Sequence, residues 1–282
     1  MNKGKDPVFI RFIKGFIIGA SMLVPGASGG TMAVILGIYD ELIHAVSSLG
    51  RNLKFNVVIL GQYVAAGILG IVLLSGPMLT ALNLWNKPMM FLFMGAIIAS
   101  IPPLYRRVRV SRIRPVNIAV CGIGALLGVL TMLLPKDLFQ FSEGFHLTNF
   151  LALTMAGIII AVALVLPGIS ASYILLMLGM YDITLLAIRE WNLSYLLPVA
   201  LGLMAGTYLC AGILEREMKR HPQFTFMLII GFMIGSLIEV FPGIPDRNEI
   251  IPCIATFLLG FFVILWVGST GKKTGNKSKK RK

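Results

Sequence analysis

Charged residues are scarce in this chain, and their scarcity excludes an ordinary water-soluble domain. Only 13% of the 282 residues are charged, whereas 57% are hydrophobic. Soluble domains carry about 25% charged residues. Many apolar runs approach the roughly 20 residues that a transmembrane helix requires, and none alternates with the two-residue period of a barrel strand. The sequence therefore predicts an all-α polytopic membrane protein.

Cysteine and histidine are also rare, and their absence from any cluster removes several kinds of site. The three cysteines lie inside apolar runs, so they predict neither a disulfide framework nor close metal-ligand spacing. The three histidines lie near the ends of apolar segments and share no ligand spacing. We therefore expect no metal site and no cofactor.

Positive charge is abundant, but its distribution argues against a nucleic-acid partner. Five arginines lie between residues 106 and 114, and seven lysines and arginines lie between residues 272 and 282. Both clusters flank apolar segments, where basic residues mark cytoplasmic loops and attract anionic lipids. We expect these contacts with membrane lipids, and a disordered basic cytoplasmic tail over 271–282.

Ten apolar segments follow one another along the chain, and their lengths predict helices. They form two halves, 1–142 and 143–270. In the first half, a hairpin over 9–49 is followed by spans at 55–74, 88–104 and 116–134. In the second, a hairpin over 147–188 is followed by spans at 195–214, 222–240 and 251–267. Within the hairpins we expect helices at 9–24, 31–49, 147–166 and 172–188.

The two halves repeat one motif. Residues 24–40 (VPGASGGTMAVILGIYD) align without gaps on residues 166–182 (LPGISASYILLMLGMYD), with seven identities in seventeen positions. A fainter echo pairs a proline, a glycine and a serine of each half: Pro88, Gly95 and Ser100 with Pro222, Gly231 and Ser236. We therefore predict a duplication that covers most of each half.

The basic clusters orient the two copies. If the N-terminus is cytoplasmic and each hairpin returns to its own side, the arginine loop, the cluster at residues 216–220 and the lysine tail all face the cytoplasm. The second hairpin then enters from the outer side. We predict an inverted-topology repeat with two helical hairpins broken at Pro-Gly-x-Ser turns, in the inner membrane with both termini cytoplasmic. Re-entrant arms and fully spanning arms place the loops on the same sides of the membrane. Re-entrant arms are the preferred interpretation.

Each Pro-Gly-x-Ser turn is a candidate anion site. Proline and glycine end one helical arm, and the next arm begins with free amides directed at the bilayer midplane. Such a helix start suits a phosphate or carboxylate. The alternative is a structural kink filled by a neighbouring helix. The candidate phosphate-binding residues are Pro25, Gly26, Ser28, Gly29, Gly30, Thr31, Pro167, Gly168, Ser170 and Ser172.

Six charged residues inside the segments are candidates for headgroup contact or proton coupling, because such residues are costly in a membrane. They are Arg11, Lys14, Asp40, Glu41, Asp182 and Glu239. Arg11 and Lys14 have Asp40 or Glu41 as possible partners. The alternative for Asp40 and Asp182 is an interfacial position at the end of a helix, with Tyr39 and Tyr181 as interfacial belt aromatics.

The stretch MLVPGASGGTMAVILGIYDELI and its echo LVLPGISASYILLMLGMYD resemble the polyprenyl-phosphate transporters, PopT, a bacterial and archaeal membrane family. The resemblance extends over nearly the whole chain, although Ala171 stands where we expect glycine. It implies a transporter, not an enzyme, that returns undecaprenyl phosphate from the outer to the inner leaflet.

Two other functions stay open at this point. Undecaprenyl-diphosphate phosphatases also have inverted hairpins with a Pro-Gly-x-Ser-Arg-Ser-Gly turn, but Gly29 and Ala171 occupy the arginine position here. A secondary transporter of a small anion would use the same helix starts. The sequence leaves the oligomeric state open.

Overall fold

The computed structural model describes residues 7–22, 28–108, 115–133 and 147–279, and these residues form twelve α-helices, a short 3-10 helix and no strand. The first half contains α1 (Val8–Ser21), α2 (Gly29–Ile35), α3 (Tyr39–Ser47), α4 (Leu53–Leu84), α5 (Asn86–Tyr105), η1 (Arg106–Val108) and α6 (Pro115–Leu133). The second contains α7 (Leu147–Val165), α8 (Ala171–Met177), α9 (Tyr181–Glu190), α10 (Leu193–Arg220), α11 (Pro222–Val240) and α12 (Ile250–Lys279). The all-helical prediction is confirmed.

Five of the described helices are long and apolar enough to cross a membrane: α4, α5, α7, α10 and α11. The helix α1 has 14 residues, so it is about 21 Å long and shorter than the roughly 30 Å hydrocarbon core. The described residues therefore belong to a multi-pass membrane protein that combines full spans with shorter helical segments.

The second arm of each hairpin is broken, which corrects the prediction of single helices at 31–49 and 172–188. Gly37 and Gly179 have φ values of +70° and +69° and separate α2 from α3 and α8 from α9. At the first break Ile38 N donates to Ala33 O at 2.9 Å and Gly37 N to Val34 O at 3.0 Å. This is the Schellman pattern of a glycine-terminated helix. Apolar periodicity continues through such a break and therefore concealed it.

Three helices extend beyond the predicted segments. The helix α4 continues through Pro77 to Leu84 instead of ending near residue 74. The helix α10 reaches Arg220, so its last turns carry the basic cluster. The helix α12 runs to Lys279, into the segment where the sequence predicted a disordered tail, and residues 280–282 lie outside the described residues.

Glycines allow the helices to pack in close pairs: α1 with α4, α7 with α10, α5 with α12 and α6 with α11. A Cβ atom added to Gly95 would lie 2.1 Å from the carbonyl oxygen of Phe257, and one added to Gly231 would lie 2.2 Å from that of Cys121. Small residues at such contacts let membrane helices approach closely enough for van der Waals packing. The Gly95/Gly231 echo in the sequence thus corresponds to two equivalent helix contacts.

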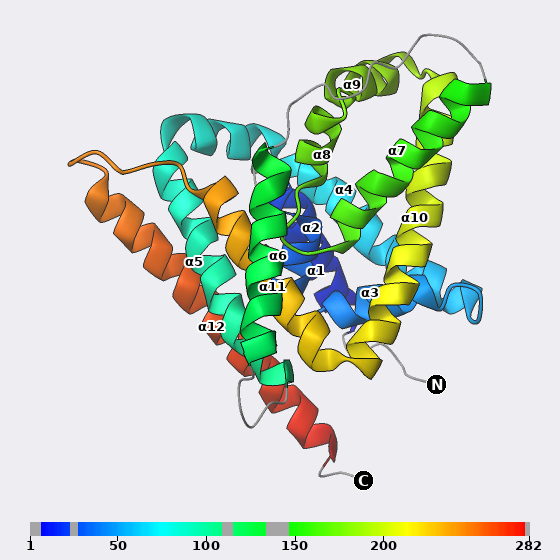
Figure 1. The fold of residues 1–282 in the computed structure, drawn as a ribbon. Helices are drawn as coiled ribbons and strands as arrows, with labels where there is room; N and C mark the ends of the chain where they lie inside the picture. The colour runs from blue at the N-terminus through cyan, green and yellow to red at the C-terminus, as the bar shows by residue number, and fades with distance from the viewer. Residues whose placement is uncertain (1–6, 23–27, 109–114, 134–146, 280–282) are drawn as a thin grey trace.

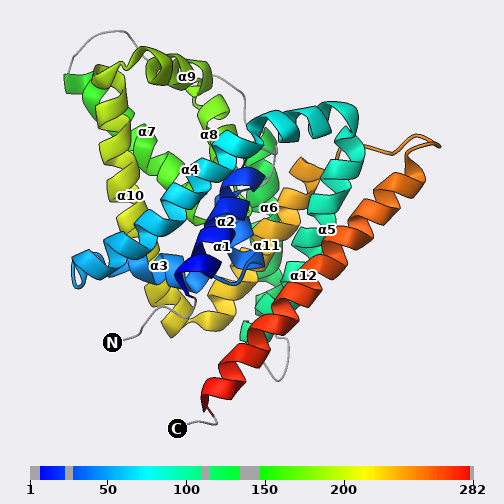
Figure 2. The same cartoon turned by 180° about the vertical axis from the view of Figure 1, so that it is seen from behind.

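The pairs α1/α4 and α7/α10 are each parallel. Gly15 faces Tyr63 and Gly19 faces Gly67, so the starts of α1 and α4 lie at the same end of the molecule. The chain between them therefore turns back. In Figure 1, α4 rises from the level of α3 toward the top, whereas α7 and α10 descend, and Figure 2 shows the same arrangement from behind.

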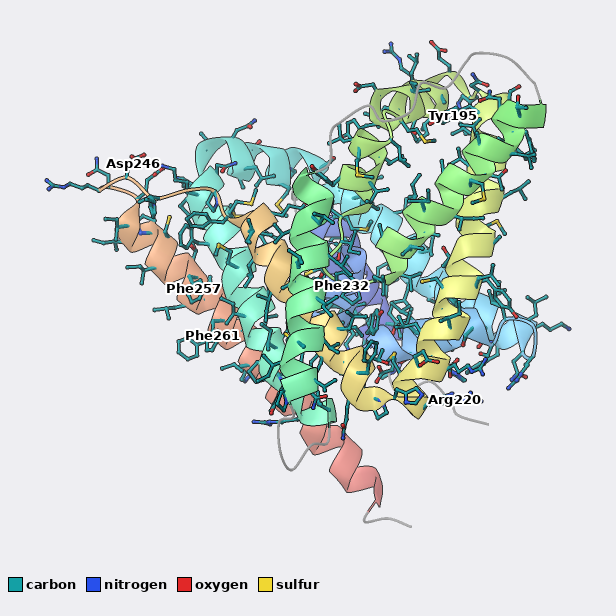
Figure 3. All side chains as sticks on the ribbon, in the orientation of Figure 1. Tyr195, Arg220, Phe232, Asp246, Phe257 and Phe261 are labelled. Carbon is teal, nitrogen blue, oxygen red and sulfur yellow. The ribbon has the colours of Figure 1, made fainter. Side chains whose placement is uncertain are left out.

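Opposite ends of the molecule differ in charge. Figure 3 labels Asp246 and Tyr195 at the upper end and Arg220 at the lower end. At the upper end, Lys87 Nζ lies 2.7 Å from Asp246 Oδ2 and 2.7 Å from Glu249 Oε2, which connects the start of α5 to the segment before α12. The hydrogen bond from Lys87 holds the pKa of Asp246 below its usual value.

The close packing of α7 on α10 gives a stability prediction. A Cβ atom on Gly202 would lie 2.0 Å from the carbonyl oxygen of Thr154, whereas one on Gly212 of the same helix meets no atom within 4 Å. We expect Gly202→Ala to destabilise the protein by about 1–3 kcal/mol, because the two helices must separate. Thermal unfolding in detergent measures this effect, and Gly212→Ala is the matched control. Equal unfolding temperatures for the two variants would contradict the prediction.

Candidate functional site

The end of the first Pro-Gly-x-Ser motif and the start of α2 contact the second turn, although 142 positions separate the two motifs in the sequence. Ser28 caps α2 by accepting a hydrogen bond from Thr31 N at 3.1 Å. The hydroxyl of Thr31 accepts a bond from Gly168 N at 2.9 Å, so the first turn binds the backbone of the second. A Cβ atom on Gly30 would lie 3.3 Å from the Cα of Pro167. We call this contact the turn junction.

Gly168 has a conformation and a contact that both require glycine. Its φ is +87°, a left-handed value that side chains oppose. A Cβ atom would lie 2.4 Å from the carbonyl carbon of Phe232 on α11, which Figure 3 labels near the centre of the bundle. The neighbouring Pro167 is fully buried. The second turn is therefore fixed between the first turn and α11.

An acidic residue reaches the second turn. Ser170 caps α8 by accepting a bond from Tyr173 N at 3.4 Å, and its side chain also forms a hydrogen bond with Glu239 near the end of α11. Ser172 is the second residue of α8, but its side chain lies outside the description, as do all atoms of Pro25 and Gly26. The structure thus brings Ser28, Thr31, Gly168, Ser170 and Glu239 to one region.

A small cavity separates the serines that cap the two turns. Its volume is about 30 Å³, and it is lined by Met22, Ser28, Gly29, Ala163, Leu164, Ser170 and Ala171. We call it the junction cavity. Such a volume holds about one water molecule. A phosphate at this place requires the turns to move apart.

A much larger cavity adjoins the first turn. Its volume is about 350 Å³, and its lining comes from α1, α2, α3 and α4 of the first half and from α7 and α10 of the second. Nearly all of the lining is apolar. We call it the apolar cavity.

The other charged candidates lie apart from the turn junction. Arg11 is buried, and its Nε atom lies 3.2 Å from Glu41 Oε1, with Nη1 donating to Gln62 at 3.4 Å. Asp40 and Glu41 lie in the first turn of α3, where a negative charge favours the helix start. The prediction that Asp40 and Asp182 end a helix is therefore wrong, because Asp182 likewise begins α9, where it is exposed. Lys14 is half-buried on α1.

The comparisons place the chain among known membrane proteins. Residues 18–252 match the family model described as VCA0040-like, undecaprenyl phosphate translocase-like. The chain belongs to this family. It is 34% identical over 276 residues to a polyprenyl-phosphate transporter of Staphylococcus aureus, covering 92% of this chain and 96% of that protein. It is 28% identical over 251 residues to a polyprenyl-phosphate transporter of Vibrio cholerae, covering 82% of this chain and 77% of that protein. No solved structure matches the chain.

The structure corrects the interpretation of one tyrosine in the motif of this family member. A belt position was one alternative for Tyr39, but this residue is only 4% exposed, and its hydroxyl donates to Val165 O at 2.9 Å. It therefore ties the first half to the segment that enters the second turn. Tyr181, its equivalent in the repeat, is half-buried. The recurrence of a tyrosine in both motifs thus does not by itself indicate burial, since the two tyrosines differ in exposure.

A polar cluster that connects α3 to α10 was not predicted from the sequence. Glu215 of α10 lies 2.7 Å from His44 Nδ1, and it also accepts hydrogen bonds from Ser47 and from Lys219. We call this set the α3–α10 cluster. The helix α3 thus packs on a helix of the other half, whereas α9 packs on α8 and α10 of its own half. None of these four residues belongs to a repeated motif, so the repeat gave no signal for them.

Proposed function

We propose that this protein transports polyprenyl phosphate across the membrane, returning undecaprenyl phosphate from the outer to the inner leaflet for cell-envelope synthesis. The observation that carries the proposal is the contact between a polar turn junction and a large apolar cavity. An anionic headgroup joined to a long hydrocarbon chain matches these two neighbouring environments. The names of the two relatives support the same substrate class. In this proposal the protein is a transporter and not an enzyme.

The proposed architecture is an inverted repeat whose hairpins are re-entrant. The parallel pairs α1/α4 and α7/α10, which run in opposite directions in Figure 1, support it. The chain's return between α1 and α4 supports re-entrant arms. The basic end of α10 and the end of α12 lie at the same end of the molecule, which supports cytoplasmic termini in an inner membrane and contact with anionic lipids there.

The proposed mechanism is alternating exposure of the turn junction. The headgroup binds to the amides and hydroxyls at the starts of α2 and α8 when the two turns separate. Glu239 lies beside Ser170 and is placed to exchange a proton with the phosphate of the headgroup. Arg11 and Glu41 are placed near the start of α1, where an arriving headgroup meets the first hairpin. The apolar cavity gives the hydrocarbon chain an apolar environment while the headgroup occupies the polar turn junction.

A leaflet assay in proteoliposomes tests this function. We expect the protein to move undecaprenyl phosphate between leaflets, to release no phosphate from undecaprenyl diphosphate and to transport no small anion. We expect the double variant Ser28→Ala, Ser170→Ala to transport at least about tenfold more slowly, because two capping hydroxyls near the headgroup are lost. The control is Ser75→Ala, which removes an exposed hydroxyl that bonds only within α4. Phosphate release from the diphosphate would instead identify a phosphatase.

A further inference from the structure

The apolar cavity is large, and residues of both halves line it. We infer that it holds the first isoprene units of the carrier lipid while the phosphate lies at the turn junction. This inference rests on the proposed function and deepens it, because it assigns a binding site to the hydrocarbon chain as well as to the headgroup.

The two cavities are neighbours. Met22, Gly29 and Leu164 line both the junction cavity and the apolar cavity. A molecule that extends from one to the other therefore passes directly from polar hydroxyls to an apolar wall. The boundary lies at Gly29, the first residue of α2, so the change of environment occurs at the start of the helix that the headgroup would contact.

The size of the apolar cavity limits its occupant to a part of one chain. Its volume of about 350 Å³ lies at the lower end of the roughly 300–1,000 Å³ that ligand sites span. A two-chain phospholipid places a glycerol unit between its phosphate and its two hydrocarbon chains, whereas the cavity that adjoins the junction cavity has room for part of one chain. A prenyl phosphate carries its phosphate directly on a single branched chain. That chemistry fits a polar junction that opens immediately into an apolar cavity.

The remainder of the long chain needs an exit to the lipid, and the cavity has one. Val64 and Ile68 of α4 line it, yet each is 58% exposed, so the cavity reaches the outer surface of the bundle. Thr207 and Ala211 of α10 also line the cavity. In the proposed inverted repeat α4 and α10 are equivalent helices, so each half contributes the same kind of helix to the cavity wall.

Filling the cavity tests the inference. We expect Ala33→Phe, which projects a ring from α2 into the cavity, to weaken the binding of farnesyl phosphate at least about tenfold by excluding part of the chain. We expect the same from Val46→Trp, which fills the cavity from α3 and covers the case in which the first variant does not fold. The matched control is Ala65→Phe, an exposed position of α4 that does not line the cavity. Binding is measured by calorimetry on purified full-length protein in nanodiscs.

Two further ligands distinguish binding of the phosphate from binding of the hydrocarbon chain. Inorganic phosphate should bind equally to all four proteins, because the turn junction is unchanged, and hexadecyl phosphate should bind the wild-type protein more weakly than farnesyl phosphate does. Unchanged farnesyl phosphate affinity in both filled variants would overturn the assignment of the cavity, and equal affinity for the straight chain would overturn its isoprenoid preference. If the wild-type protein neither binds farnesyl phosphate nor moves undecaprenyl phosphate, the proposed function itself fails.

Discussion

Cross-linking α3 to α10 is expected to stop transport almost completely. The α3–α10 cluster joins a hairpin of one half to a long helix of the other through His44, Ser47 and Glu215. Tyr39 adds a bond from the same hairpin to Val165. If the two halves must move apart to expose the turn junction, these contacts must break in each cycle. A covalent link between Ser47→Cys and Glu215→Cys prevents that separation.

The experiment uses a chain in which the free cysteines Cys121, Cys210 and Cys253 are replaced, so that only the introduced thiols react. A short cleavable linker is added to proteoliposomes, and undecaprenyl phosphate movement is measured before and after reduction. The control pair is Glu215→Cys with Lys219→Cys, which shares one position but links residues of a single helix. We expect the interhelical link to abolish movement reversibly and the intrahelical link to leave it unchanged. Full activity of the α3–α10 link would show that this contact does not open.

The two halves are equivalent in sequence but not in their contacts. The helix α3 packs against α10 of the other half, whereas α9 packs on its own half. Tyr39 is buried and bonded, whereas Tyr181 is half-buried, and Asp182 is exposed. An alternating mechanism needs two such states that exchange roles between the halves. We propose that the structure corresponds to one of them, with the α3 side closed.

The sequence predicted the helical spans well because length and apolar composition are direct consequences of the bilayer. It also predicted equivalent positions in the two halves, since a motif is duplicated at half the chain length. It failed inside the hairpins. A break at Gly37 depends on one positive φ value, and the apolar residues on both sides conceal it.

The polar groups at the turns show why the site was only partly predictable. Helix starts suggested polar groups open to an anion, but Ser28 and Thr31 bond each other and the amide of Gly168. Gly168 belongs to the opposite half, so local sequence cannot reveal this partner. Glu239 and the apolar cavity likewise depend on tertiary contacts between distant segments. The sequence therefore indicated a candidate site at the two turns, and the structure adds the hydrogen bonds and the apolar cavity beside it.

Removing Glu41 is expected to be strongly destabilising. Arg11 is 7% exposed, and its guanidinium lies against the Glu41 carboxylate, whose side chain is 16% exposed. In Glu41→Leu the guanidinium keeps only the longer contact with Gln62 at 3.4 Å. Breaking a buried pair by removing one partner costs about 3–5 kcal/mol, because the remaining charge stays desolvated. We expect a corresponding loss in apparent unfolding temperature in nanodiscs, and poor recovery of folded protein.

The double variant Arg11→Met, Glu41→Leu separates this cause from a loss of packing. Replacing both charges by apolar side chains of similar size is often neutral or stabilising, so we expect the double variant to recover most of the stability lost in Glu41→Leu. Its transport activity then becomes informative. If a folded double variant binds inorganic phosphate normally but moves undecaprenyl phosphate slowly, the pair contributes to headgroup entry. If its stability remains as low as that of Glu41→Leu, the cost lies in lost side-chain packing around residue 41 and not in the stranded charge.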